Sequence, residues 1–426
     1  MVVAERTETR ATDSIVWRKD LYPRFEPDPA TIQRYAESIE YLPPIEVNQH
    51  NELIDGYHRW TAHKKAQLAE VPVTVTVTES DAQLLRLAIE RNATHGLQLS
   101  LEDKRRMAQK LYGAGAADKD DLARILAVSR RAVAGWVESI DSTRREERKR
   151  TIFDMWMRCH TQEEIADAVG TDQSVIARES KELCNLEKLP KSIKLAAEYQ
   201  DADWSPQLYD IWNFAKNSNS TKHYGNTAVE IVDNLLYTFT KPFDVVVDPF
   251  GGGGSTIDVC KRRLRRYWVS DRKPVPERPD IREHDIVSDR VSGPSRWKGV
   301  KLVYLDPPYW KQAAGKYSND PTDLANMLLE EFTDHMVGLI HTYAANMEVG
   351  SHIACIISPT QWPNEDKSVN YHDIDLACRV GKNLRLVRRA LCPYSSEQYN
   401  GTQVEIAKGR KLWLVLSRTL LVWERV

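Results

Sequence analysis

The sequence predicts an α/β protein in which a mostly parallel, doubly wound sheet follows a small α+β domain and an all-α region. Three observations support this prediction. Short strand-like and helix-like segments end in the alternating run Val71–Thr78, residues 80–199 show apolar residues only at helical spacing, and strands alternate with helices after residue 200. These changes divide the chain into three segments, which are residues 1–80, 81–199 and 200–426.

The 426 residues include 59 Lys and Arg and 61 Asp and Glu, which gives a formal net charge of −2. Such a chain has no global positive field, so any contact with nucleic acid must rest on local groups of basic residues. The cysteines and histidines show no spacing typical of a disulfide framework or a zinc site, and no bound metal is expected. Because no apolar segment has the length of a signal peptide or a membrane span, we expect a cytoplasmic protein.

In the N-terminal segment, Gly56, His58 and Arg59 lie within the stretch Leu53–Gln67. This stretch resembles the G-x-x-R phosphate loop of ParB-like nucleotide-binding or nuclease domains, and the resemblance implies that these three residues contact a nucleotide phosphate. The second nucleotide-contacting motif is matched only loosely, by Glu90–Asn92. CTP binding and a DNA-clamping or dimerising role without CTP therefore both stay open, and His58 can equally be a packed imidazole.

Two stretches of the middle segment, Asp121–Val137 and Thr161–Arg178, have the pattern of helix-turn-helix units. Turns are expected at Ala127–Ser129 in the first stretch and at Gly170 in the second. Exposed residues on the second helix of each unit are placed to reach base edges or phosphates. These candidate DNA-binding residues are Arg130, Arg131, Gln173, Ser174 and Arg178. Any helical hairpin gives a similar pattern, so plain packing is the alternative for each unit.

Two basic runs stand out, Arg144–Arg150 between the two helical units and Lys261–Arg266 in the last segment. Runs of like charge are usually solvated helix faces. We expect this for the second run in particular, because it lies inside the α/β segment.

The most specific feature of the last segment is Leu305–Trp310, which reads LDPPYW at the end of the apolar strand Lys301–Leu305. Two consecutive prolines remove two backbone donors and fix φ at both positions, so this loop is expected to be rigid. In open α/β sheets, ligands bind at the carboxyl edge of the strands. The sequence therefore predicts that Asp306 lies at a ligand site.

An earlier strand, in Phe243–Thr256, ends at Asp248 and runs into four glycines before a helix. Glycines permit positive φ and a close approach of a ligand to the backbone, as at nucleotide-like cofactors. The next strand ends at Asp271, where an acidic residue is placed to accept hydrogen bonds from ribose hydroxyls. Asp285 follows the strand after that. For any single one of these aspartates, a cap or turn role is the alternative.

The stretch Asp248–Thr256 resembles the F-x-G-x-G loop of S-adenosylmethionine-dependent DNA amino-methyltransferases, and Asp306–Tyr309 resembles their D-P-P-Y motif. The resemblance covers most of residues 205–426 and implies a Rossmann-like methyltransferase sheet with an antiparallel closing strand in Leu412–Val426. In such enzymes one segment lies beside the methionine part of the cofactor, and the resemblance implies that Trp212–Phe214 and His223–Thr227 form this segment here. The implied cofactor contacts are Asp248, Phe250, Gly252, Gly254, Ser255, Asp271, Asp285 and Thr227.

The chemistry that this resemblance implies is methyl transfer to an exocyclic amine, whose lone pair is delocalised into the base ring. Asp306 and the Pro307 carbonyl can each accept one amine hydrogen, which holds the lone pair on the methyl group. The base must be flipped out of the duplex, with Tyr309 stacking on it and Trp310 as a second stacking candidate. The implied catalytic residues are Asp306, Pro307, Pro308 and Tyr309.

The sequence thus favours a DNA adenine-N6 methyltransferase, because Asp at the head of the motif is more typical of adenine enzymes. The alternatives are a cytosine-N4 enzyme and a ParB-like, CTP-gated DNA-binding protein with an inactive methyltransferase domain. Few residues are left for target-recognition loops, namely Gln361–Tyr371 and Tyr394–Ala407, so the helix-turn-helix region is expected to supply some recognition. Duplex DNA is the expected partner and no membrane is expected. A homodimer, a partner endonuclease, a restriction-modification system and the target sequence stay open.

Overall fold

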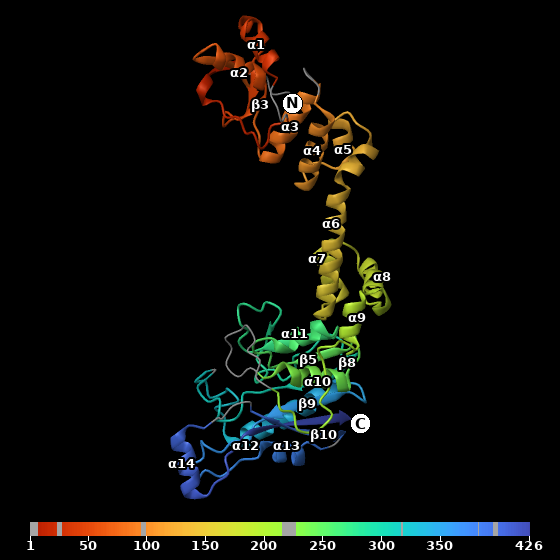
Figure 1. Ribbon diagram of the computed structural model, residues 1–426, viewed down its shortest axis with the longest axis vertical. Coiled ribbons are helices and arrows are strands. Elements are labelled where there is room, and N and C mark those ends of the chain that lie inside the picture. Colours follow the sequence, from red (N-terminus) through yellow and green to blue (C-terminus); the bar gives the residue numbers. More distant parts are fainter. Residues whose placement is uncertain are drawn as a thin grey trace. The chain divides into compact units, whose positions relative to one another are not determined.

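The chain divides into two compact units in a computed structural model (Figure 1), Met1–Glu147 and Arg148–Val426. The boundary falls inside the long helix α6 (Arg130–Met157), and the three-segment division remains a prediction. Among the helices in the described part of the chain, none is both long and apolar enough to cross a membrane. The structure describes residues 7–23, 28–94, 99–214, 227–316, 318–381, 383–394 and 399–426.

The first unit contains a four-stranded sheet in the order β1-β4-β2-β3. Its strands are β1 (Thr7–Ala11), β2 (Ile45–Val47), β3 (Leu53–Asp55) and β4 (Glu70–Val75). The alternating apolar residues of β4 predict this strand correctly, since Val71 and Val73 are buried against Ile45 and Trp60. Helices α1 (Pro29–Ala36) and α2 (Tyr57–Lys65) accompany this sheet, and short 3₁₀ turns lie at Thr12–Ser14 and Ile39–Tyr41. The expected small α+β arrangement is therefore present.

The predicted all-α region is confirmed in the described residues between β4 and residue 200. Its helices are α3 (Asp81–Thr94), α4 (Leu101–Gly113), α5 (Lys119–Ile125), α6, α7 (Gln162–Val169), α8 (Gln173–Leu183) and α9 (Lys191–Ala197), with a 3₁₀ turn at Leu186–Lys188. Polar caps begin several of them: Ser100 accepts the Asp103 N–H, and Asp118 accepts the Asp120 and Asp121 N–H groups.

The second unit is built on a seven-stranded sheet in the order β10-β11-β9-β8-β5-β6-β7. Its strands are β5 (Val245–Asp248), β6 (Arg266–Asp271), β7 (Arg282–Glu283), β8 (Val300–Leu305), β9 (His352–Ile357), β10 (Leu384–Pro393) and β11 (Ser417–Arg425). The strands β5 to β9 are parallel, whereas β11 pairs antiparallel with both β9 and β10. The α/β fold class and its antiparallel closing strand are thereby confirmed.

Helices cover both faces of this sheet (Figure 1), as the continuous apolar sequence of β5 requires. Val245 and Val247 pack in one core with α12 (Leu329–Asn346) and α13 (His372–Arg379), while Val246 packs in the other with α10 (Val229–Phe239) and α11 (Ser255–Arg262). Successive side chains of a strand point to opposite faces. The result is a three-layer arrangement that leaves the carboxyl edge of the sheet for a site.

The stretch Tyr394–Ala407, which the sequence predicts as a loop, is partly helical. Helix α14 spans Gly401–Arg410 and begins with a capping box, in which Asn400 and Gln403 accept each other's backbone N–H. The loop prediction is wrong for this part because an Asn three residues before a Gln is a helix start signal. Residues 395–398 lie outside the described residues.

The basic run Lys261–Arg266 corrects the prediction in part, because Lys261 and Arg262 are exposed as expected whereas Arg263 and Arg265 are not. Arg263 and Arg265 are only 1% and 2% exposed. Arg263 donates to both carboxylate oxygens of Asp233 on α10, and Arg265 donates to the Ala197 carbonyl on α9. The prediction fails because the run crosses from α11 into β6, where polar groups of two neighbouring helices receive these side chains.

Candidate active site

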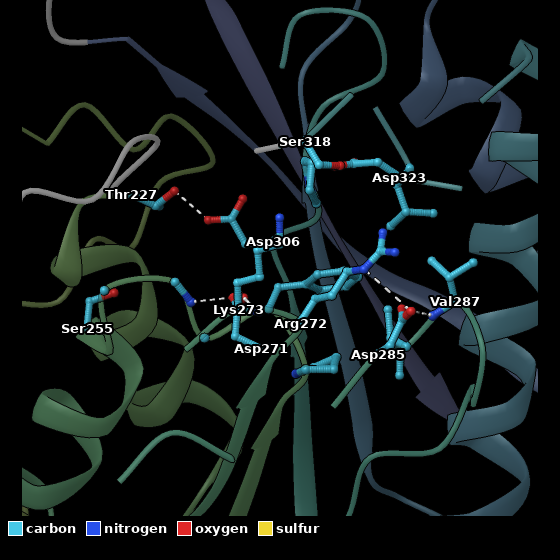
Figure 2. Close-up of a pocket in the computed structure, with 18 residues that line it drawn as sticks. Thr227, Ser255, Asp271, Arg272, Lys273, Asp285, Val287, Asp306, Ser318 and Asp323 are labelled. Atoms are coloured by element: carbon cyan, nitrogen blue, oxygen red, sulfur yellow. Dashed lines mark hydrogen bonds and ion pairs between the residues drawn. The ribbon is translucent and has the colours of Figure 1, made fainter. Parts of the chain in front are cut away.

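Three carboxylates stand at the carboxyl ends of neighbouring strands. Asp248 ends β5, Asp271 ends β6, and Asp306 follows β8 directly. From β5 the chain continues to β6 on one side and later to β8 on the other, which makes this edge a topological switch point where open sheets bind ligands. A pocket lies there (Figure 2), and both Asp271 and Asp306 line it.

Asp248 lies behind the glycine loop and does not line the pocket. One carboxylate oxygen accepts the Phe250 N–H at 2.8 Å, and the other accepts the Thr256 hydroxyl at 2.6 Å. Burial raises the pKa of Asp248 to about 7. Its contacts join the start of the loop to the first turn of α11, so Asp248 fixes the shape of the loop rather than facing its ligand.

The glycine loop brings bare backbone to the pocket at Gly251–Gly253. A Cβ on Gly251 would lie 2.6 Å from Cγ1 of Val269 in β6, so only glycine lets the loop pack so closely on that strand. Gly254 has φ of +83° and lies outside the pocket lining, with Arg278 donating to its carbonyl at 3.3 Å. Ser255, the first residue of α11, and Phe250 both line the pocket, and their contact with a cofactor stays a prediction.

Asp271 links the loop to β6. Its two carboxylate oxygens accept the N–H groups of Gly252 and Lys273, each at 2.9 Å. A carboxylate has about four lone-pair positions, so Asp271 retains capacity for further hydrogen bonds inside the pocket. The predicted position of an acidic acceptor at the end of the second strand is therefore matched by the geometry.

Asp285 lines the pocket beyond β7, where it accepts the Val287 N–H at 3.1 Å. Arg272 forms an ion pair with it, with Nε 3.4 Å from Oδ2 (Figure 2). Arg272 also donates to Asp320 at 2.9 Å. The sequence analysis did not identify Arg272 as a residue of the pocket. Its position directly after Asp271, at the end of a strand, is the same signal that identified the aspartate.

Asp306 has hydroxyl donors on both oxygens. Thr227 donates to Oδ2 at 2.5 Å (Figure 2), Tyr309 donates to Oδ1 at 3.1 Å, and the Tyr304 hydroxyl lies 3.4 Å from Oδ2. Burial raises the pKa of Asp306, while the hydrogen bond from Thr227 and the charge of Arg418 act to lower it. Thr227 and Asp306, which the sequence predicts separately as a cofactor contact and a catalytic residue, are thus in direct contact across 79 residues of sequence.

The rest of the D-P-P-Y motif is divided between pocket and core. Pro308 lines the pocket, Pro307 is buried, and Tyr309 is partly buried beside Asp306. Trp310 is only 8% exposed and donates its indole N–H to the Met327 carbonyl at 2.9 Å. The expectation that Trp310 stacks on a base is therefore wrong, because its ring is committed to the core.

The segment expected beside the methionine part of the cofactor is only partly described. Trp212 and Phe214 pack in the core that contains α10, and the Trp212 N–H bonds to the Leu391 carbonyl of β10 at 2.8 Å. Residues 223–226 lie outside the described residues. Thr227 is consequently the one predicted residue of this segment that the structure places in the pocket lining, within the described ranges.

Both helix-turn-helix patterns fold as expected. Helices α5 and α6 flank a turn in which Ala127 has φ of +49°, and Gly170, with φ of +64°, ends α7 before α8. Val133 and Ile176 on the second helices are fully buried. The five candidate DNA-binding residues are all exposed: Arg130, Arg131, Gln173, Ser174 and Arg178. Arg130 also pairs with Asp120 at 2.7 Å.

The N-terminal candidates have internal partners. Gly56 precedes α2 with φ of +101°, and the ring of His58 accepts the Asp28 N–H at 2.9 Å. Arg59 pairs with Asp55 at 2.7 Å and donates to the Pro44 carbonyl at 2.5 Å. These contacts explain the residues structurally, and a phosphate contact at this loop stays a prediction.

Comparison with known proteins gives a family match. The sequence model of the N6_N4_Mtase family, described as DNA methylase, matches residues 8–274, which include the glycine loop and Asp271 and end before β8. The Type II methyltransferase M.BamHI of Bacillus amyloliquefaciens is 33% identical over 60 residues. That stretch is 14% of this chain and 14% of the relative, so the chain matches only a small part of its length.

Solved structures resemble parts of the chain. A C-terminally truncated ParB from Caulobacter crescentus, complexed to the centromeric parS site, is 20% identical, with 30% of this chain and 69% of that chain covered and a TM-score of 0.25. TrmN from Thermus thermophilus is 14% identical, with 48% and 50% covered and a TM-score of 0.31. An rRNA methylase from Streptococcus thermophilus is 10% identical, with 47% and 98% covered and a TM-score of 0.28. With scores this low, the fold rests on the sheet order described above.

Proposed function

This chain belongs to the family of N6/N4-type DNA methylases, and from that membership we propose that it transfers a methyl group from S-adenosylmethionine to the exocyclic N6 of adenine in duplex DNA. The observation that carries the proposal is the position of Asp306. Its carboxylate, held by Thr227 and Tyr309, lines the same pocket as the glycine loop and Asp271.

The donor and acceptor groups of the pocket fit S-adenosylmethionine, the cofactor of this family. Asp271 has lone pairs left for ribose hydroxyls, the backbone of Gly251–Gly253 is open to the pocket, and Phe250 offers an apolar surface. Asp285, fixed by Arg272, is a further acceptor. When bound, the cofactor supplies an electrophilic methyl group on a sulfonium.

In the proposed reaction, Asp306 accepts one hydrogen of the target amine and the Pro307 carbonyl accepts the other. This holds the nitrogen lone pair towards the methyl group and stabilises the positive charge that develops on nitrogen as the N–C bond forms and the S–C bond breaks. One amine proton is then lost to water, and S-adenosylhomocysteine is the other product. Thr227 and Tyr309 fix the orientation of the carboxylate, so no reorganisation is needed as charge develops. The Tyr309 ring stacks on the flipped base.

Base identity separates this proposal from its nearest alternative. The amines of adenine and cytosine are chemically alike, and the Asp at the head of the motif is what favours adenine. Labelled methyl transfer to mixed-sequence duplex DNA, followed by digestion to nucleosides and mass spectrometry, should show N6-methyladenine. N4-methylcytosine would correct the base, and the absence of any methylated base would overturn the proposal.

The cofactor site can be tested separately from catalysis. Asp271→Ala should weaken the binding of S-adenosylhomocysteine about 10- to 100-fold, because a charged hydrogen-bond acceptor contributes about 1.5–3 kcal/mol. Isothermal titration calorimetry measures this. The matched control is Glu283→Ala, an exposed acidic residue of the neighbouring strand β7 outside the pocket lining. If both variants bound S-adenosylhomocysteine with equal affinity, Asp271 would not be a cofactor-binding residue.

We also propose that both helix-turn-helix units contact the DNA, because their second helices carry exposed basic residues. The double variant Arg131→Gln and Arg178→Gln should bind duplex DNA more weakly, and the slope of log affinity against log salt should fall by about 1 for each lost phosphate contact. Fluorescence anisotropy over a salt series measures both quantities. Arg385→Gln, on an exposed arginine of β10, is the control, and an unchanged slope in the double variant would contradict the assignment.

A further inference from the structure

Arg418 is a buried cation in the immediate surroundings of Asp306, and nothing in the sequence points to it. It is the second residue of β11, in the closing hairpin, and is only 9% exposed. Its Nη1 donates to the Thr227 hydroxyl at 3.2 Å, and that hydroxyl in turn donates to Asp306. Its Cζ lies 5.0 Å from the ring centre of Tyr394.

Burying a guanidinium is costly unless a negative charge and hydrogen bonds compensate for it. Here the compensation comes from the negative charge of Asp306, which Arg418 reaches through the shared Thr227 hydroxyl. Among the described residues, Nε of Arg418 has no hydrogen-bond partner. The hydrogen bond that Arg418 does make leads to Asp306 through Thr227.

We propose that Arg418 is a positioning residue of the methyl transfer, which keeps Asp306 ionised and oriented through Thr227 so that both carboxylate oxygens remain acceptors. This inference rests on the proposed function. A protonated Asp306 would carry a hydrogen on one oxygen and lose its negative charge, and it could no longer stabilise the charge that develops on the amine nitrogen.

The balance of charges around Asp306 makes Arg418 the decisive group. Burial raises the pKa of Asp306, and the charge of Arg418 acts to lower it. Asp306 in turn adds to the effect of burial in raising the pKa of Asp248. The cations that line the pocket within the described residues, Arg272 and Lys273, follow β6, and Arg272 is already paired with carboxylates. Within the described residues, the titratable groups that interact with Asp306 from neighbouring elements are Asp248, Tyr304, Tyr309, Cys355, Cys392, Tyr394 and Arg418, and Thr227 adds a hydroxyl donor.

The test is the pH dependence of single-turnover methyl transfer with saturating DNA and cofactor. Arg418→Gln removes the charge, so the pKa of Asp306 should rise and the acid limb of the rate profile should move to higher pH. A shift of one pH unit corresponds to an about tenfold lower rate on that limb, with recovery as the pH is raised. Arg418→Lys keeps the charge and should restore most of the acid limb.

A uniformly lower rate at every pH in Arg418→Gln, with no shift of the limb, would overturn the inference and leave Arg418 a structural residue. Infrared titration of the carboxyl band, with Asp306→Asn to identify the signal, gives a readout that needs neither DNA nor cofactor. An unshifted Asp306 titration in Arg418→Gln would also overturn the inference. If the wild type transfers no methyl group, the proposed function fails, whereas the infrared titration still decides the effect of Arg418 on Asp306.

Discussion

Asp306→Asn should lower the single-turnover rate of methyl transfer by about 10²- to 10³-fold, the range found when one preorganised group facing the developing charge is removed. The amide keeps the size of the side chain but has no negative charge, and it turns one acceptor atom into a donor that points at the amine hydrogens. The two hydroxyl donors from Thr227 and Tyr309 then meet an amide that can satisfy only one of them well.

Rapid mixing of a preformed enzyme–DNA complex with labelled cofactor measures this rate directly. Binding of S-adenosylhomocysteine should stay within about twofold of the wild type, which corresponds to a change of about 0.4 kcal/mol in binding free energy. Asp289→Asn, at an exposed aspartate outside the pocket lining, is the matched control. A rate for Asp306→Asn close to that of the control would show that another group holds the amine.

The sheet and its edge were predictable because their signals are local. Continuous apolar residues give β5 and β8, prolines and glycines mark the loops that follow them, and a carboxylate stands at the end of each strand. The order of parallel strands then brings Asp271 and Asp306 to one pocket without any knowledge of long-range contacts.

What could not be predicted depends on contacts between distant parts of the chain. Arg418 and Thr227 are separated by 191 residues, and only the pairing of β11 between β9 and β10 brings them together. A single arginine in an apolar closing strand carries no local sign of this role. Trp310 shows the opposite error, because its place in the motif suggested a ligand contact although its indole belongs to the core.

The basic run Lys261–Arg266 shows that the burial of charged side chains also depends on distant contacts. A stability measurement separates the two interpretations of this run, a solvated helix face and a set of buried ion pairs. Arg263→Ala should lower the free energy of unfolding by about 3 kcal/mol, the lower end of the range for breaking a buried ion pair, because Asp233 keeps only the half-exposed Arg262 as a partner, at 2.6 Å. The side chains of Arg263 and Asp233 are 2% and 3% exposed and share two hydrogen bonds of 2.9 and 3.0 Å. Arg263 also donates to Asp201 at 2.8 Å.

Urea unfolding, followed by circular dichroism, measures the change in the free energy of unfolding. Lys261→Ala, in the same run, is the matched control, since that side chain is half exposed and its pairing with Asp280 is a surface interaction. Exposed pairs contribute about 0–1 kcal/mol, so the two variants should differ by about 2 kcal/mol or more. If both variants lost an equally small amount of unfolding free energy, the run would behave as the solvated face that its composition suggests. A large loss for Arg263→Ala alone would instead assign it to the packing of α11 against α10.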